Sequence, residues 1–151
     1  MINMKYMIWA LLAGSFIPVV GILNGRASRV LGDPFHACLL VFLITLVLAV
    51  LAMLLAGRGV PDLGDFAKLQ PIEFGAGLIV AFYVMSATML APKIGVANFI
   101  VMAVSGQIIF SLMIDHFGLF GTPVRPVSLL QIGGAAMLLG GLIITQLANG
   151  K

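Results

Sequence analysis

Charged side chains are scarce in this sequence, and their scarcity excludes a water-soluble globular domain. Only 9% of the 151 residues are charged, whereas 62% are hydrophobic. A soluble domain carries about 25% charged residues, which it needs to cover its surface. The net charge of +3 is spread along the chain without a basic cluster that contains aromatic residues, and this excludes a nucleic-acid partner. The composition therefore places the chain in the membrane class.

Cysteine is almost absent, and the residues that build most enzyme sites do not cluster. The single cysteine, Cys38, excludes an internal disulfide, and its apolar surroundings predict a small buried side chain. The two histidines, His36 and His116, lie 80 residues apart, so the short spacing of a metal site is missing. No Ser/His/Asp or Cys/His set falls at one predicted depth in the membrane. We therefore expect no enzymatic activity, no bound metal and no cofactor.

Long uncharged segments are what the sequence has in abundance. Charged residues bound five of them, each between 19 and 25 residues long. About 20 residues at a rise of 1.5 Å cross a hydrocarbon core of about 30 Å. Because nothing remains for a soluble domain, we predict an all-α integral membrane protein in which residues 1–151 form a single five-helix transmembrane domain. The predicted helices cover about 5–24, 35–56, 73–91, 95–116 and 127–147.

Proline and glycine predict where these helices bend and end. Pro18 lies inside the first predicted helix and removes a backbone hydrogen bond, which predicts a kink. We expect Asn24-Gly25 to end this helix, Pro34 to stand near the start of the next, and Pro92 to end the third. The connection after Pro92 is so short that the third and fourth helices are expected to be antiparallel neighbours.

The fourth predicted helix, 95–116, differs from the others in its polar content. Asn98 and Ser105 are seven residues apart and share one face of the helix. Gln107, Ser111 and Asp115 follow one another at intervals of four residues and share another face. A polar side chain in lipid is costly unless another helix or water satisfies it. Two interpretations stay open: hydrogen bonds between helices, worth about 0.6–2 kcal/mol each, or a stripe that lines a cavity.

On the second interpretation, polar side chains of the third and fourth helices bind a substrate. These candidates are Tyr83, Ser86, Asn98, Ser105, Gln107 and Ser111. Gln107 is the best single candidate, because an amide near the middle of a span has both donors and an acceptor to satisfy.

Asp115 and His116 are candidates for coupling transport to protons or cations. Asp115 is the acid at the border of the polar helix, and histidine changes its charge near physiological pH. The alternative is structural: Asp115 meets water at a helix end or pairs with Arg125 across the loop.

Four glycines repeat in the last predicted helix at a spacing of seven residues. They are Gly133, Gly134, Gly140 and Gly141. Glycine lowers helix propensity, so the close approach of another helix is the best explanation for this face. We predict that it forms a dimer interface; the alternative is packing against helices of the same chain.

Positive charges are balanced between the two ends of the predicted helices. With five spans, one end holds Lys5, Arg58, Lys68 and Arg125, and the other holds Arg26, Arg29, Lys93 and Lys151. The positive-inside rule then gives no preferred orientation. A chain without such a bias can insert both ways, and inverted units that meet about an axis in the membrane plane form the midplane site of many carriers.

Several short motifs resemble a known family. They are NG at 24–25, GDP at 32–34, APKIGV at 91–96, GQ at 106–107, SL at 111–112 and IDHFG at 114–118. Together they are similar, over the whole chain, to the five-helix, YdcZ-like branch of the drug/metabolite transporter superfamily. The glycine-rich last helix resembles the dimer helix of the related small multidrug resistance proteins. Those proteins bind cations and protons with a glutamate in their first helix, and this chain has no acid there, so their coupling scheme does not carry over.

The resemblance implies a secondary transporter of a small molecule across the bacterial inner (cytoplasmic) membrane, built as one half of an inverted-repeat carrier. The implied partners are the lipid bilayer, a small-molecule substrate, and either a second, inverted copy of the chain or a sister five-helix protein. The alternative function is a non-transporting membrane subunit that acts as an assembly or regulatory partner. Whether Gln107 and Ser111 face water or protein discriminates between the two.

Overall fold

The computed structural model describes residues 3–149, and this part of the chain contains helices and loops without a strand. Within the described residues, five helical segments are long and apolar enough to cross a membrane. They are Met4–Leu31, Pro34–Leu55, Pro71–Ile94, Val96–Phe117 and Leu129–Ala148. The prediction of an all-α integral membrane protein with five transmembrane helices is confirmed.

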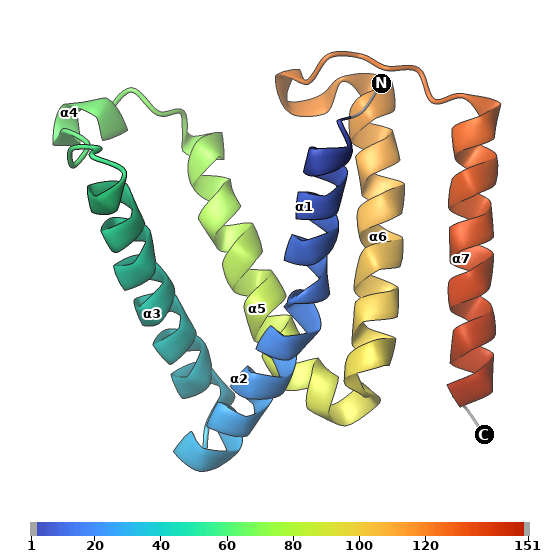
Figure 1. Cartoon of the computed structure of the whole chain (residues 1–151), viewed down its shortest axis with the longest axis horizontal. Coiled ribbons are helices and arrows are strands. Elements are labelled where there is room, and N and C mark those ends of the chain that lie inside the picture. The colour runs from blue at the N-terminus through green and yellow to red at the C-terminus, as the bar shows by residue number, and fades with distance from the viewer. Residues whose placement is uncertain (1–2, 150–151) are drawn as a thin grey trace. The chain divides into compact units, whose positions relative to one another are not determined.

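The chain forms two compact units, the first up to Val96 and the second from Ala97 onward. The elements of the first are α1 (Met4–Ser15), α2 (Ile17–Leu31), α3 (Pro34–Leu55), α4 (Leu63–Phe66), η1 (Pro71–Phe74) and α5 (Gly75–Ile94) (Figure 1). The second holds α6 (Val96–Phe117), whose first residue belongs to the first unit, η2 (Leu119–Gly121) and α7 (Leu129–Asn149).

The first span is broken where a proline removes a backbone donor. α1 stops before Phe16, and Pro18 stands in the first turn of α2. A proline is tolerated in that turn because its missing N–H has no intrahelical acceptor there. The break predicted from Pro18 is therefore present.

The predicted end of the first span at Asn24-Gly25 is wrong, because α2 continues to Leu31. It ends at Gly32, whose φ of 74° lies in the left-handed region that favours glycine. Asn24 is buried and hydrogen-bonded to other helices, and Gly25 packs against α5. Tertiary contacts thus use both residues, and neither makes the turn that the Asn-Gly pair favours locally.

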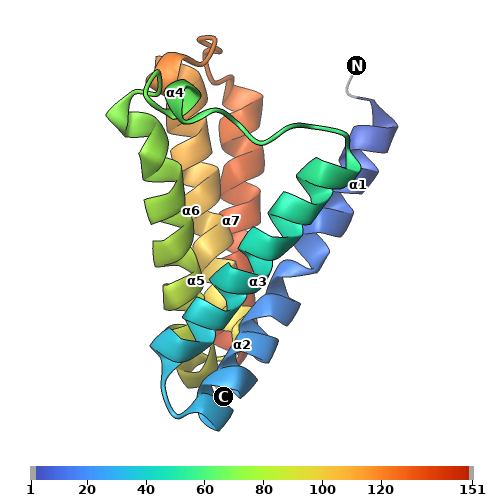
Figure 2. The same ribbon diagram turned by 90° about the vertical axis from the view of Figure 1, so that its left-hand side faces the viewer.

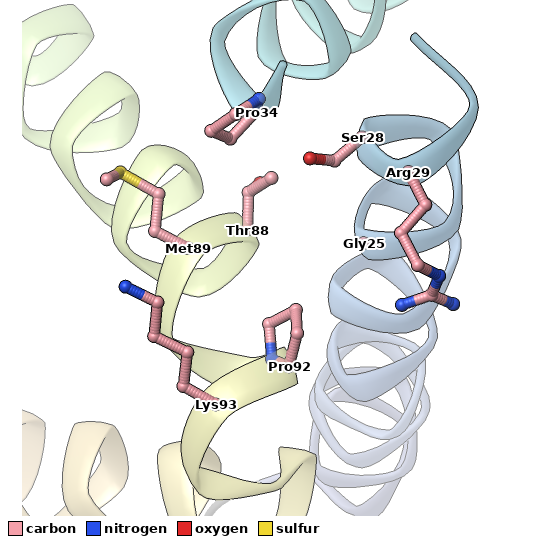
Figure 3. A pocket seen from close by; sticks show the side chains of 8 residues that line it. All are labelled: Gly25, Ser28, Arg29, Pro34, Thr88, Met89, Pro92 and Lys93. Carbon is pink, nitrogen blue, oxygen red and sulfur yellow. The ribbon is translucent and has the colours of Figure 1, made fainter. Parts of the chain in front are cut away.

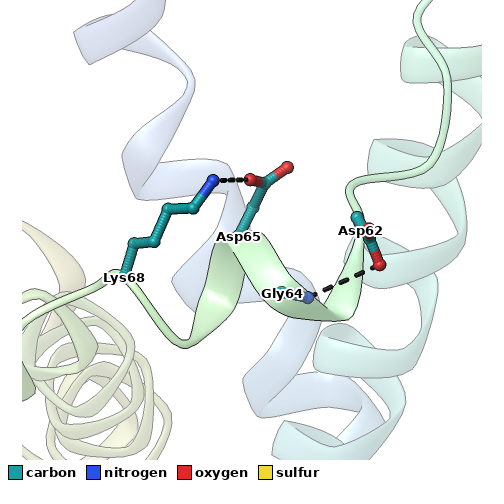
Figure 4. A network of polar contacts seen from close by, with 4 residues as sticks. All are labelled: Asp62, Gly64, Asp65 and Lys68. Carbon is teal, nitrogen blue, oxygen red and sulfur yellow. Dashed lines mark hydrogen bonds and ion pairs between the residues drawn. The ribbon is translucent and has the colours of Figure 1, made fainter.

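Local polar contacts organise the loops around α3 and α4. Asp33 caps α3, and its Oδ1 accepts hydrogen bonds from the N–H groups of Phe35 at 2.6 Å and His36 at 3.4 Å. In the loop after α3, Lys68 Nζ lies 2.7 Å from Asp65 Oδ1 (Figure 4). Exposed pairs of this kind contribute little to stability, so they shape the loop more than they hold the fold.

Pro92 does not end α5, contrary to the prediction. The helix runs to Ile94 and ends at Gly95, whose N–H donates to the carbonyl of Ala91 at 3.0 Å. A proline deprives one carbonyl, four residues earlier, of its donor. So close to the end of α5, this loss affects only one bond of the helix, and the helix continues for two more residues.

The core of the first unit lies where α2, α3 and α5 pack together; Figure 2 shows α2 and α3 side by side. Small residues bring the three backbones close: Gly21, Gly25, Ala37, Ala87 and Ala91 are all buried. A Cβ added to Gly21 would lie 3.8 Å from Ala91 Cβ, and one added to Gly25 would lie 3.2 Å from Pro92 Cγ. Small residues are the usual means of close helix packing in membranes.

In the second unit, the loop after α6 folds back on the end of that helix. The N–H of Arg125 donates to the carbonyl of Asp115 at 2.8 Å, and the N–H of Val127 donates to Nδ1 of His116 at 3.3 Å. Ser128 immediately precedes α7, and its N–H donates to Oε1 of Gln131 at 2.9 Å. The loop is therefore tied to the two residues predicted to couple transport.

Candidate functional site

Three polar side chains meet in the core of the first unit. Asn24 of α2 and Thr88 of α5 are each 2% exposed, and Cys38 of α3 is 4% exposed. Nδ2 of Asn24 donates to Oγ1 of Thr88 at 2.5 Å and contacts Sγ of Cys38 at 3.8 Å. Sγ of Cys38 donates to Oγ1 of Thr88 at 3.4 Å. The three helices are thereby joined through polar contacts where the small residues let them approach.

The hydrogen-bonding capacity of this cluster is not fully used. The Thr88 hydroxyl donates to the carbonyl of Val84 at 2.8 Å, so its oxygen is left to accept from Asn24 and Cys38. Oδ1 of Asn24 is buried and has no hydrogen-bond partner among the described residues. Buried polar groups are nearly always paired, and an unpaired one costs about 1–3 kcal/mol. The Asn24 oxygen is therefore a place where a water or a ligand group would be stabilising.

A pocket of about 250 Å³ lies beside the cluster. Residues of α2, α5 and the start of α3 line it: Gly25, Ser28, Arg29, Pro34, Thr88, Met89, Pro92 and Lys93 (Figure 3). We call it the α2–α3–α5 pocket. Figure 3 shows the Ser28 hydroxyl pointing between the helices, with the ends of Arg29 and Lys93 extending on opposite sides. Thr88 belongs both to the wall of this pocket and to the buried cluster.

A second hollow of about 300 Å³ runs along α5. Its lining is Phe82, Met85, Ser86, Met89, Leu90 and Lys93. We call it the α5 groove. It shares Met89 and Lys93 with the α2–α3–α5 pocket. The two hollows therefore adjoin at these two side chains.

The charge around the α2–α3–α5 pocket is of one sign. Arg29 and Lys93 line it, and no acidic residue does. Neither cation forms an ion pair within residues 3–149. Asp33 precedes the lining residue Pro34, but its carboxylate caps α3. The two positive charges are thus left without a protein counter-charge.

The residues predicted to bind substrate fall on α5 and α6. Ser86 lines the α5 groove, and Tyr83 is half-buried one turn earlier on the same helix. On α6, Asn98 and Ser105 are half-buried, whereas Gln107 and Ser111 are exposed. The α5 and α6 candidates belong to separate units.

The hydroxyl groups on α6 are already bonded within their own helix. Ser105 Oγ donates to the carbonyl of Val101 at 2.8 Å, and Ser111 Oγ donates to the carbonyl of Ile108 at 2.9 Å. Such bonds leave the oxygen free to accept from an incoming group. The amide of Gln107 is exposed and is the longest polar side chain on this face.

Asp115 and His116 are both exposed at the end of α6. His116 Nδ1 accepts the hydrogen bond from Val127, and its ring contacts that of Phe117 edge-on at 4.8 Å. Arg125 reaches Asp115 through backbone atoms, and the described part of the chain holds no ion pair between their side chains. Within residues 3–149 the Asp115 carboxylate therefore has no ion-pair partner.

The four glycines of α7 are open to their surroundings. A Cβ added to Gly133, Gly134, Gly140 or Gly141 would meet no described atom within 4 Å outside its own helical turn. This differs from Gly25, where the space is taken by Pro92. The glycine face of α7 is thus without a close neighbour in the described part of the chain.

Residues of the α2–α3–α5 pocket were not predicted as site residues. From the sequence, Asn24 is predicted to end a helix, and Arg29 and Lys93 enter only as charges that set topology. One signal was present: Asn24 and Ser28 are four residues apart, as are Thr88 and Pro92. Residues four apart share a helix face. A helix that continues past Asn24 therefore carries Asn24 and Ser28 on the same face, and α5 carries Thr88 and Pro92 on one face.

Comparisons with known proteins identify the family. No curated protein and no solved structure matches the chain. A family profile described as "Putative inner membrane exporter, YdcZ" matches residues 5–144, which include all five spans except the last turn of α7. The chain therefore belongs to the YdcZ family of inner membrane exporters and is a multi-pass protein of the inner membrane.

Proposed function

We propose that two copies of this chain, inserted in opposite orientations, form one exporter of a small molecule. The observation that carries the proposal is the equal share of positive charge at the two ends of an odd number of spans. Arg26 and Arg29 lie near the end of α2, and Lys93 lies in the last turn of α5. Arg58 lies in the loop after α3, toward the opposite end. Lys151 lies outside the described residues and enters the count from the sequence.

The unpartnered faces of the chain support a second copy. The glycines of α7 have room for a closely packed helix, and close backbone approach is what such faces favour in membranes. Gln107 and Ser111 of α6 are exposed, and exposure of these groups to lipid would be costly. A partner helix or a water-filled cavity at the interface would relieve that cost.

Inverted pairing also supplies a transport mechanism. Two identical units related by an axis in the membrane plane present the same polar residues from both halves of the pair. Rocking of one unit against the other then opens the shared cavity to one side of the membrane at a time. On this proposal the substrate is bound by polar side chains of α5 and α6, namely Tyr83, Ser86, Asn98, Ser105, Gln107 and Ser111. A non-transporting subunit would instead cover these polar groups with a partner protein, so the family match to an exporter, rather than their exposure, favours transport.

The experiment that tests the proposal is a topology measurement on the full chain in bacterial cells. Two C-terminal fusions are compared, one with alkaline phosphatase, which is active only outside the cytoplasm, and one with a fluorescent protein that matures only inside. We expect both fusions to give signal. Adding two lysines to the loop after α3 should shift the population toward one orientation, and adding two beside Arg29 should shift it oppositely.

A one-sided reporter in the native sequence would reject the homodimer. It would leave a sister five-helix protein of opposite charge bias as the partner. Cross-linking of single-cysteine variants in a Cys38→Ala background, at Gly140 on α7, then reports whether two copies or two different chains meet at this face.

A further inference from the structure

The α2–α3–α5 pocket combines features that do not arise from membrane placement alone. Long basic side chains commonly reach from a helix end toward the lipid headgroups, and this accounts for Arg29 and Lys93 being charged. It does not account for a half-buried hydroxyl, that of Ser28, in the same pocket. Within residues 3–149 this hydroxyl makes no hydrogen bond, and in Figure 3 it points into the space between α2 and α5.

The wall opposite Ser28 is fixed by the buried cluster. The Thr88 hydroxyl is committed to Val84, Asn24 and Cys38. A ligand in the pocket therefore meets a preorganised wall at Thr88 and movable donors at Ser28, Arg29 and Lys93. Two cations, one free hydroxyl and no acid are a set of groups that favours an anion.

The α5 groove adds an apolar requirement. It begins at Lys93 and Met89, which it shares with the pocket, and continues over Phe82, Met85 and Leu90. A ligand whose negative group lies near Lys93 would place its remaining atoms against these side chains. Burial of an apolar body there is favourable by the hydrophobic effect, and about 250 Å³ of pocket is enough for a single aromatic ring with a charged substituent.

We propose that this pocket and groove bind an amphipathic organic anion, and that such an anion is the class of molecule the exporter transports. The sulfonate, carboxylate or phosphate lies beside Ser28 and accepts a hydrogen bond from its hydroxyl. The long side chains of Arg29 and Lys93, whose ends extend on opposite sides in Figure 3, turn toward the anion when it binds. The apolar body lies along Met89 and the α5 groove. The second half of the proposal rests on the export function. Two sources share this chemistry: a water-soluble organic acid and an anionic phospholipid that enters from the bilayer.

The test is equilibrium binding to the purified full chain in nanodiscs of neutral phosphatidylcholine. The probe is radiolabelled benzenesulfonate, which is charged at every working pH. Unlabelled benzenesulfonamide has nearly the same shape without the charge, and phenyltrimethylammonium has the opposite charge. We expect benzenesulfonate to bind saturably and the two analogues to compete poorly, by a factor of about ten or more. Equal competition by the cation would overturn the proposal.

Paired variants connect the binding to the named residues. Arg29→Gln with Lys93→Gln should weaken benzenesulfonate binding at least about tenfold, because two charge-assisted contacts are lost. Lys5→Gln with Arg58→Gln removes the same charge from the other end and should leave binding within about twofold. Each double variant removes two positive charges, one variant from one end of the spans and the other from the opposite end. An effect on binding that came from a changed orientation in the membrane would therefore appear in both variants. Unchanged binding in the first variant would overturn the proposal.

Two further variants test whether the loss of binding comes from misfolding or from the change in total charge. Exchange of the two cations, Arg29→Lys with Lys93→Arg, keeps both charges and should retain most of the binding. Ser28→Ala should weaken binding severalfold while the chain elutes unchanged in gel filtration. Loss of binding in the exchange variant equal to that in the double glutamine variant would mean that the two charges do not act as anion contacts.

Anionic lipid distinguishes the two sources. If phosphatidylglycerol added to the nanodiscs displaces benzenesulfonate from the native chain, the lipid headgroup occupies the pocket. If binding is unaffected, a soluble anion is the ligand. Absence of benzenesulfonate binding, together with equal retention of phosphatidylglycerol by the native and double glutamine chains in native mass spectrometry, would reject both. Because this assay does not depend on topology, its failure alongside a two-sided reporter would remove the ligand class and leave the inverted pair standing.

Discussion

The side-chain amide of Asn24 on α2 donates a hydrogen bond to the hydroxyl of Thr88 on α5 at 2.5 Å, across 64 positions of sequence. Both residues are 2% exposed, and neither belongs to the polar helix that dominates the sequence pattern. Thr88 also lines the α2–α3–α5 pocket, so the pair links the packing of the first unit to the place where we propose that a ligand binds.

Replacing Thr88 by valine should destabilise the first unit. Valine keeps the shape but removes the hydroxyl acceptor of the buried Asn24 amide and leaves it only Sγ of Cys38 at 3.8 Å, which costs about 1–3 kcal/mol. Thr88→Ser should retain most of the stability because the hydroxyl remains. Thr45→Val is the matched control, since the Thr45 hydroxyl is exposed and bonds only to Val41 of its own helix at 2.8 Å. Unfolding of the purified protein in detergent, followed by circular dichroism, measures the difference. Equal stability of Thr88→Val and Thr45→Val would show that the pair contributes nothing.

Gly25 should tolerate no large side chain. A Cβ at this position already lies 3.2 Å from Pro92 Cγ, so leucine would force α2 and α5 apart at a cost of about 1–3 kcal/mol or more. Gly14→Leu is the control, because a Cβ on Gly14 would meet nothing within 4 Å. The same unfolding assay compares the two, and the benzenesulfonate assay should show weaker binding for Gly25→Leu alone. Similar behaviour of both variants would argue against the close contact of α2 with Pro92.

Hydropathy was sufficient to predict the five spans, because the thickness of the bilayer fixes the length of each apolar segment. It was not sufficient at Asn24-Gly25 and Pro92. Both are local turn or stop signals, but their outcome depends on which helix packs against them. Asn24 is satisfied by Thr88, and Gly25 accommodates Pro92, so the helix persists where the local signal predicts its end.

The candidate site was harder to predict than the fold for the same reason. Ser86 was selected from its polarity alone, and it does line the α5 groove. Arg29 and Lys93 were visible in the sequence, but a charge at a helix end predicts orientation and interfacial placement before it predicts a ligand. Arg29 and Lys93 line the same pocket only because α2 and α5 are rotated so that both side chains face it. The periodicity of a single helix does not predict how that helix is rotated relative to another.

Gly140→Leu should prevent dimer formation. A leucine on the open glycine face of α7 keeps a partner helix from close backbone approach. Gly77→Leu on α5 is the control, since Gly77 has equally open surroundings and does not belong to the seven-residue glycine repeat. Chemical cross-linking in native membranes and size-exclusion chromatography with light scattering report the oligomeric state. Dimers of normal abundance in Gly140→Leu would reject α7 as the interface.

Asp115 is the best candidate for coupling transport to a proton or cation gradient, and its surroundings sharpen the test. It is exposed at the end of α6, eight residues from Gln107 on the same face. The backbone N–H of Arg125 donates to the carbonyl of Asp115, but within residues 3–149 the two side chains form no ion pair. The structural alternative of an Asp115–Arg125 ion pair is therefore not realised. Asp115→Asn removes the charge and keeps the size, and because the loop is held by the backbone carbonyl, the fold of the loop should not change.

In proteoliposomes, Asp115→Asn should therefore lose movement of labelled benzenesulfonate driven by an imposed pH gradient while it retains exchange of benzenesulfonate across the membrane without a gradient. Asp62→Asn is the matched control, since Asp62 caps the short helix α4 in the exposed loop.

His116→Gln adds a second measurement, because the imidazole accepts the hydrogen bond from the N–H of Val127 at 3.3 Å. The side-chain oxygen of glutamine can replace that acceptor, and glutamine carries no titratable group. Gradient-driven transport with unchanged pH dependence in Asp115→Asn would assign this carboxylate to structure. Because no other acid lies within the predicted spans 5–24, 35–56, 95–116 and 127–147, coupling would then have to come from Glu73 at the start of the third span, or from the exchange of one anion for another.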